Sequence, residues 1–162
     1  MAARLLATDD SRALLLLRVT LALVLLPHAA QKLFGWFGGA GIQGTLTGFE
    51  QYLGIPVALG IVAIATEALA PIALLLGLGT RVAAVALAGQ MAVAGWTHRA
   101  NGFFANWSGT QAGEGVEYHL LYIGAALALA IGGGGAGSLD RKLAARASGD
   151  LDLPLQSLRR AA

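Results

Sequence analysis

The chain has 162 residues, of which 56% are hydrophobic and only 12% are charged, about half the charged share of a soluble globular domain, so its composition favours a protein dissolved in a lipid bilayer. The formal net charge of +2 is too small, and the basic residues are too scattered, to indicate a nucleic-acid-binding surface. The absence of cysteine excludes disulfides, thiolate catalysis, iron–sulfur clusters and zinc–thiolate sites.

Four apolar runs are long enough to cross a bilayer as helices, because about 20 helical residues span the hydrocarbon core. The predicted spans cover about residues 13–34, 56–78, 81–98 and 116–133. The predicted fold class is therefore an all-α membrane protein with a bundle of four transmembrane helices. Residues 1–142 form this transmembrane domain, and residues 143–162 form a short cytoplasmic tail.

Basic residues are unequally distributed between the two sides of the predicted bundle. One side has only Lys32 and Arg99. The other side has Arg4, Arg12, Arg81, Arg141, Lys142, Arg146, Arg159 and Arg160. Lysine and arginine favour the cytoplasmic flanks of membrane spans, so we expect both termini to be cytoplasmic.

The loop that joins the first two spans contains a pattern typical of a helix lying on a membrane surface. Ile42, Leu46, Phe49 and Leu53 fall at helical spacing, which predicts a short amphipathic helix on the outer leaflet. Aromatic residues also gather in the two outer loops, where the headgroup region favours them. Trp36, Phe37, Phe104 and Trp107 are predicted to roof the mouth of the bundle.

Several polar side chains interrupt the predicted spans, and each charged one costs about 2.5–3.5 kcal/mol at the bilayer centre, which by default indicates a site or a pathway. They are Arg18, His28, Lys32, Glu67, Gln90, Glu117 and His119. At about 100° per residue, Arg18, His28 and Lys32 share a narrow arc of the first span. That face is therefore predicted to point into the bundle.

The polar residues divide by depth into two groups. Arg18 and Glu67 are predicted to meet near the midplane as an ion pair, and a functional role for the Glu67 carboxylate stays open as the alternative. At the outer end His28, Lys32 and His119 are predicted to converge under the aromatic roof, with His98 nearby. Tyr122 shares the face of His119 as a hydrogen-bond donor, whereas Glu117 points away and complements the helix dipole.

Metal and haem binding are disfavoured by the spacing of the histidines. The three histidines lie in separate elements and form no compact HxH or HxxxH pair. The glycine-rich run at 132–137 follows a predicted span and has no preceding strand or Walker lysine, so it is interpreted as a helix exit and not as a phosphate loop.

Five motifs follow one another along the chain: HAAQKLFGWFGG at 28–39, ATEALAPIALLLGLGTR at 65–81, Gln90-Met91, GVEYHLLY at 115–122 and GGAGSLDR at 134–141. In order and spacing they resemble the DoxX family of small bacterial four-helix membrane proteins. The resemblance covers roughly residues 12–142. Ala29 and Gly135 depart from the glycine and proline that are usual in the family, which affects packing more than chemistry.

The resemblance implies the bacterial cytoplasmic membrane and a role in quinone-dependent oxidation, since relatives are described as membrane subunits of thiosulfate:quinone oxidoreductase, of terminal quinol oxidase and of oxidative-stress complexes. Matched by motif, the positions carried over are Arg18, His28, Lys32, Glu67, Arg81, Glu117 and Ser138-Leu139-Asp140.

The leading hypothesis is therefore a subunit that binds quinone but takes its electrons from a partner oxidoreductase or a bound prosthetic group. His28, Lys32, His119 and Glu67 are the candidate catalytic residues: either histidine transfers protons, Lys32 stabilises negative charge, and Glu67 with Arg18 relays protons or holds the helices together. The candidate quinone-binding residues are Arg18, Gln90, Trp36, Phe104, Trp107 and Tyr122.

The alternative hypothesis is a non-catalytic scaffold, or a carrier whose outer cavity binds a lipid or a small apolar solute. Membrane lipid is an expected partner under both hypotheses, and a second copy of the chain is another candidate partner.

Overall fold

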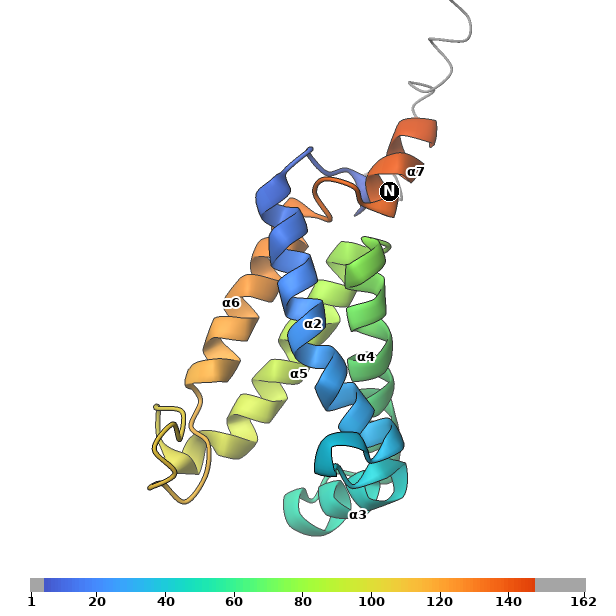
Figure 1. The fold of residues 1–162 in the computed structure, drawn as a ribbon. Coiled ribbons are helices and arrows are strands. Elements are labelled where there is room, and N and C mark those ends of the chain that lie inside the picture. The colour runs from blue at the N-terminus through green and yellow to red at the C-terminus, as the bar shows by residue number, and fades with distance from the viewer. Residues whose placement is uncertain (1–4, 148–162) are drawn as a thin grey trace, which may run out of the picture.

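The computed structural model describes residues 5–147, and all the regular secondary structure in that range is helical (Figure 1). The long helices are α2 (Arg12–Phe34), α4 (Val57–Leu76), α5 (Thr80–His98) and α6 (Glu117–Gly132). The shorter ones are α3 (Gly41–Leu53), α7 (Leu139–Ala147) and the 3₁₀ turns Trp36–Gly38 and Arg99–Asn101. The four long helices lie within two residues of the ranges predicted as spans.

Helices α2 and α4 are long and apolar enough to cross a membrane, and α6 is apolar but shorter, with 16 residues. Helix α5 has 19 residues and includes polar Arg81 and Gln90. The structure thus shows an all-helical chain with two helices of membrane-spanning character among the described residues. That all four long helices cross a bilayer stays a prediction.

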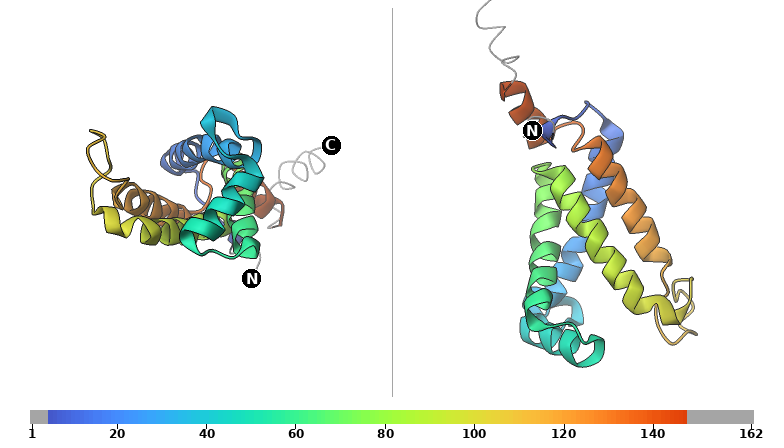
Figure 2. Two further views of the ribbon diagram at one scale, coloured as in Figure 1. Left: turned by 90° about the horizontal axis from the view of Figure 1, so that it is seen from below. Right: turned by 180° about the vertical axis from the view of Figure 1, so that it is seen from behind.

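The bundle is closed at one end and spread at the other. Helix α2 packs on α4 and α6, α4 packs on α5, and α5 packs on α6. Residues 5–11 and α7 lie at the closed end, whereas α3 and the loop 99–116 lie at the opposite end (Figure 1). Toward that opposite end the α2–α4 pair and the α5–α6 pair diverge, as the right panel of Figure 2 shows.

The core consists of aliphatic and alanine side chains at the centre of the bundle. It includes Leu21, Ala22, Leu25, Leu74, Ala84, Leu87, Ala126 and Leu129, all nearly inaccessible. Large apolar side chains on the opposite faces of the same helices are exposed, among them Leu121 at 75% and Ile131 at 79%. Such extensive apolar exposure would be unstable in water but suits a helix bundle in lipid.

Local sequence signals explain where α2 begins and ends. The Ser11 hydroxyl accepts a hydrogen bond from the Leu14 amide, as a helix N-cap does. The helix ends at Gly35, whose left-handed φ of 71° is easily adopted only by glycine. The 3₁₀ turn and α3 then follow, so the chain turns across the open end of the bundle before α4 begins.

The amphipathic helix predicted after the first span exists as α3 and packs on the beginning of α4. Leu46 and Phe49 face Gly60 of α4, where a side chain would approach Leu46 Cδ2 to 2.8 Å. Ile42 and Leu53 are exposed. The predicted tail starts inside α7, and its residues from 148 onward lie outside the described range.

Candidate functional site

The predicted ion pair between Arg18 and Glu67 is wrong. Arg18 is 2% exposed, and among residues 5–147 its guanidinium donates hydrogen bonds only to backbone carbonyls. The acceptors are Leu74 at 2.7 Å, Leu75 at 2.6 Å, Gly134 at 2.8 Å and Ala136 at 3.3 Å. The last carbonyls of a helix have no partners within it, so Arg18 binds the end of α4. Glu67 lies about two turns away along α4.

Two further polar residues from the matched motifs, Asp140 and Arg81, lie at the closed end and also bind helix termini. Asp140 is 1% exposed and accepts hydrogen bonds from the amides of Gly79 at 2.7 Å and Thr80 at 2.9 Å, which begin α5. Arg81 donates to the Ala130 carbonyl at 2.6 Å and to that of Ile131, which end α6. These contacts join the helix ends and the glycine-rich exit of α6 into one polar layer.

Glu67 instead forms an ion pair with Lys32. The Lys32 Nζ lies 2.6 Å from Glu67 Oε1, and the two side chains are 25% and 5% exposed. Gln90 Nε2 donates to the other carboxylate oxygen of Glu67 at 2.9 Å. The three residues come from α2, α5 and α4, so this network ties three helices together. The positive charge of Lys32 is therefore balanced within the protein.

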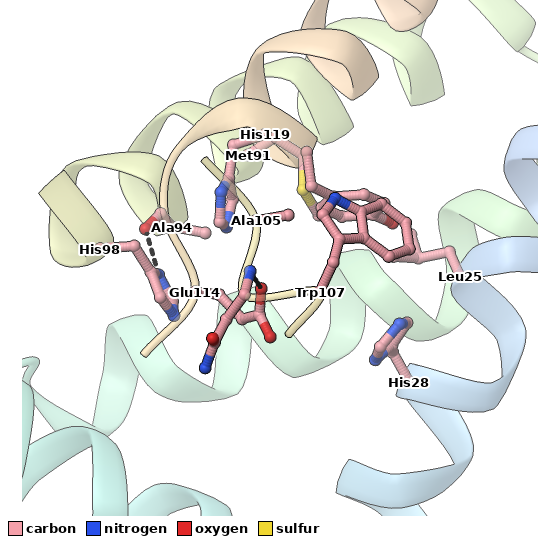
Figure 3. Close-up of a pocket in the computed structure, with 11 residues that line it drawn as sticks. Leu25, His28, Met91, Ala94, His98, Ala105, Trp107, Glu114 and His119 are labelled. Carbon is pink, nitrogen blue, oxygen red and sulfur yellow. Dashed lines mark hydrogen bonds between the residues drawn. The ribbon is translucent and has the colours of Figure 1, made fainter. Parts of the chain in front are cut away.

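A cavity of about 530 Å³ opens between α2, α5, α6 and the loop 99–116 (Figure 3). Its lining residues are Leu25, His28, Met91, Ala94, His98, Ala105, Asn106, Trp107, Glu114, Tyr118 and His119. The sequence predicts that His28 and His119 share a cavity at this end, and the structure agrees. In Figure 3 His28 lies on one side, on α2, while His98 and His119 lie together on the other.

His98 and His119 form a close pair, although the sequence analysis kept only His119 among the site residues. Their ring centroids are 4.9 Å apart and the ring planes are inclined by 31°. His119 is 8% exposed, whereas His98 ends α5 beside the loop. The pair forms because Gly95 has no side chain, so α5 approaches His119 closely. Sequence spacing within one helix cannot reveal such a contact.

The loop 99–116 is held by side chains that bind its backbone. Glu117 accepts a hydrogen bond from the Ala105 amide at 2.9 Å, and Glu114 accepts one from the Asn106 amide at 2.7 Å. Asn106 Oδ1 accepts from the Gln111 amide at 3.0 Å, while Asn106 Nδ2 donates to the Gln111 carbonyl at 3.2 Å. The loop thus presents Trp107, whose side chain borders the cavity although the residue is 90% exposed.

The remaining predicted site residues do not line this cavity. Arg18 lies at the closed end, and Lys32, Glu67 and Gln90 form their separate network. Trp36 borders a different, apolar groove of about 620 Å³ on α2 and α4. Phe104 is exposed on the loop, and the buried Tyr122 donates to the Leu21 carbonyl at 3.2 Å. Of the predicted aromatic roof, only Trp107 borders the cavity.

The sequence analysis missed several lining residues. Leu25 and Met91 belong to ordinary apolar runs, and Asn106, Glu114 and Tyr118 reach the cavity through the fold of the loop and the start of α6. Within residues 5–147 no group of three or more histidine, cysteine, aspartate or glutamate side chains is arranged to hold a metal ion.

Comparison with known proteins adds a family assignment. The family model described as DoxX matches residues 13–100, which is more than half of the chain. No curated protein and no solved structure matches the chain.

Proposed function

The chain belongs to the DoxX family, and on that premise we propose that it is a quinone-interacting subunit of an oxidoreductase in the bacterial cytoplasmic membrane. The family and the apolar helices α2 and α4 indicate a membrane protein. We further propose that α5 and α6 also cross the bilayer, with both termini on the cytoplasmic side.

The packing of the helices supports four spans. Helices α5 and α6 run beside α2 and α4 and contribute to the same core (Figure 1). Val82, Val85 and Val93 of α5 and Leu121 and Ile131 of α6 are exposed on the outside. A membrane that accommodates α2 and α4 therefore also surrounds these apolar faces. The short length of α6 is offset by the polar layer and the loop at its two ends.

The main evidence for quinone binding is the cavity, which has histidines on opposite sides. A quinone ring is flat and apolar and bears two oxygens at opposite ends, so it requires apolar walls and polar groups facing each end. Leu25, Met91 and Trp107 supply apolar surface. His28 faces one end, and the His98–His119 pair faces the other (Figure 3).

The proposed roles follow from these positions. A bound quinone supplies the capacity to carry two electrons and two protons, and the electrons come from a partner oxidoreductase. His28 and the His98–His119 pair hold the ring oxygens and exchange protons with them. Lys32, Glu67 and Gln90 keep α2, α4 and α5 in place, because one carboxylate oxygen of Glu67 binds Lys32 and the other accepts from Gln90 Nε2.

Ligand binding in nanodiscs tests the proposal. A decyl-chain benzoquinone is titrated against the protein while tryptophan fluorescence is recorded, and molecules that co-purify in mild detergent are identified by mass spectrometry. We expect saturable quenching, lost in Trp107→Phe and weakened at least about tenfold in His119→Gln, which corresponds to about 1.4 kcal/mol. Trp36→Phe is the matched control, since Trp36 lies outside the cavity. Quenching that depends on Trp36 and ignores His119 would refute the proposed site.

The scaffold or carrier hypothesis is supported by one separate observation. The groove on α2 and α4 is lined almost entirely by apolar side chains, including Pro27, Leu69 and Trp36. Because it lies on the two helices of membrane-spanning character, it favours binding of a lipid acyl chain. If mass spectrometry finds phospholipid and no quinone, and decyl-benzoquinone does not bind, this second function replaces the first.

A further inference from the structure

The hydrogen bonding of His98 decides which of its ring nitrogens is left to bind a ligand. His98 Nδ1 lies 2.8 Å from the carbonyl oxygen of Ala94, one turn earlier in α5. A carbonyl oxygen only accepts hydrogen bonds, so Nδ1 must carry the proton and donate. In the neutral ring Nε2 then has a lone pair and no proton. Because Nδ1 faces its own helix, Nε2 is the ring nitrogen left without a partner among residues 5–147, and His98 lines the cavity.

The surroundings of His98 add a second hydrogen-bond acceptor. One carboxylate oxygen of Glu114 accepts from the Asn106 amide, and its carboxylate borders the same cavity. His119 lies 4.9 Å from His98, ring centroid to ring centroid. This side of the cavity therefore holds two acceptors, the unprotonated Nε2 of His98 and the Glu114 carboxylate, beside His119, whose neutral ring has one donor and one acceptor nitrogen.

His28, on the opposite side of the cavity, has no such preference for a hydrogen-bond donor. Its ring makes no hydrogen bond within residues 5–147, so either nitrogen is free to carry the proton and to donate or accept. Tyr118 has a hydroxyl group with the same versatility. The two ends of the cavity thus differ: the unprotonated Nε2 of His98 and the Glu114 carboxylate bind only a donor from the ligand, whereas His28 binds a ligand group of either kind.

From this asymmetry we propose that the cavity selects ring ligands that bear a phenolic hydroxyl, and so binds a hydroquinone in preference to the corresponding quinone. The hydroxyl donates to His98 Nε2, whereas a quinone carbonyl would place its lone pairs against the lone pair of that nitrogen. A polar group that loses water on binding and finds no partner lowers affinity. This inference rests on the proposed function and adds the redox state of the ligand.

The test compares three probes in nanodiscs under argon: decyl-benzoquinone, its hydroquinone, and the dimethyl ether of that hydroquinone. We expect the hydroquinone to bind at least about tenfold more tightly than the other two, the size of change that about 1.4 kcal/mol produces. His98→Phe should abolish this preference by weakening hydroquinone binding alone. His98→Gln, whose amide can donate, should shift the preference toward the quinone. His28→Phe is the matched control and should weaken both forms while keeping their ratio.

A second measurement reads the tautomer of His98 without any ligand. The chain has three histidines, so nitrogen-15 NMR of histidine-labelled protein gives three pairs of ring-nitrogen signals, one Nδ1 and one Nε2 signal per ring, which His28→Phe and His98→Phe assign. We expect the His98 signal of the Nδ1–H tautomer. Equal binding of the two redox forms, tighter binding of the quinone, or an Nε2–H tautomer would overturn the inference while the proposed function stands. If none of the three probes binds, the inference falls together with the proposed function.

Discussion

At the scale of single residues, buried charges in this protein are satisfied in two different ways. Arg18 neutralises no carboxylate by direct contact; its planar guanidinium reaches four backbone carbonyls from α4 and the exit of α6. Glu67 forms an ion pair with Lys32 and a hydrogen bond with Gln90. A guanidinium suits several carbonyls because its five N–H groups point in fixed and divergent directions.

We predict that Lys32 and Glu67 are energetically coupled. Removing one partner of a buried ion pair costs about 3–5 kcal/mol, whereas removing both costs much less, so Lys32→Met and Glu67→Met should each lower the melting temperature strongly and the double variant only mildly. Thermal unfolding in detergent measures all three. The exposed pair Asp10–Arg141 is the control, where the same cycle should show coupling of about 0–1 kcal/mol. Additive losses at Lys32 and Glu67 would contradict the pairing.

The substitution Arg18→Lys should lower the stability of the protein although it keeps the positive charge. Lysine in Arg18→Lys cannot reach four carbonyls at once, and hydrogen bonds to charged groups contribute about 1.5–3 kcal/mol each. We therefore expect a loss of about 2–3 kcal/mol in the free energy of unfolding, with ligand affinity unchanged because Arg18 lies far from the cavity. Arg12→Lys, at an exposed position of the same helix, should change stability by less than about 0.5 kcal/mol. Equal effects at the two positions would argue against the carbonyl contacts.

At the scale of elements, the distance between α5 and α6 determines the shape of the cavity. Gly95 allows this approach: a Cβ atom there would lie 3.2 Å from Cβ and 3.5 Å from Cγ of His119. The other end of α5 is fixed by Asp140 from α7, which binds the first amides of the helix. Both contacts join segments that are distant in sequence.

Gly95→Ala should weaken ligand binding without destabilising the fold. The added methyl group must displace His119 by a few tenths of an ångström, and because misplacement by about 1 Å can cost a hundredfold, we expect about a threefold to tenfold loss of affinity for decyl-hydroquinone. Alanine is favoured over glycine in a helix by about 0.8–1.0 kcal/mol, so melting should not fall. Gly89→Ala, on the same helix with open space around it, should leave affinity unchanged. An unaltered affinity in Gly95→Ala would indicate that the position of His119 is unimportant.

At the scale of the whole molecule, the different polarity of the two ends supports the proposed orientation. The closed end combines residues 5–11, α7 and most of the basic residues, whereas the open end carries α3, the loop 99–116 and exposed aromatic side chains (Figure 1). Exposed tryptophan and phenylalanine suit the headgroup region, and basic residues suit the cytoplasmic side.

Because the chain has no cysteine, single introduced cysteines can report this orientation. In intact cells Ser108→Cys, in the loop of the open end, should react with a membrane-impermeant maleimide. Lys142→Cys, exposed on α7, should react only after permeabilisation. The reverse labelling pattern would show that the termini face outward, and labelling of both sites in intact cells would show that the chain does not cross the membrane in the proposed way.

The positions and type of the long helices followed from the sequence, because hydrophobicity and capping are local properties of consecutive residues. The inward face of α2 was likewise predictable from helical periodicity, and so was the shared cavity of His28 and His119. The partners of Arg18 and Glu67 were not. Residue spacing gives depth along one helix, but the contact of two side chains also depends on how the helices tilt and rotate against each other. The divergence of the helix pairs, the close approach at Gly95 and the folding of the loop 99–116 set those variables. Only the tertiary structure therefore decided that Lys32 binds Glu67, that His98 joins His119, and that Trp107 alone of the predicted roof reaches the cavity.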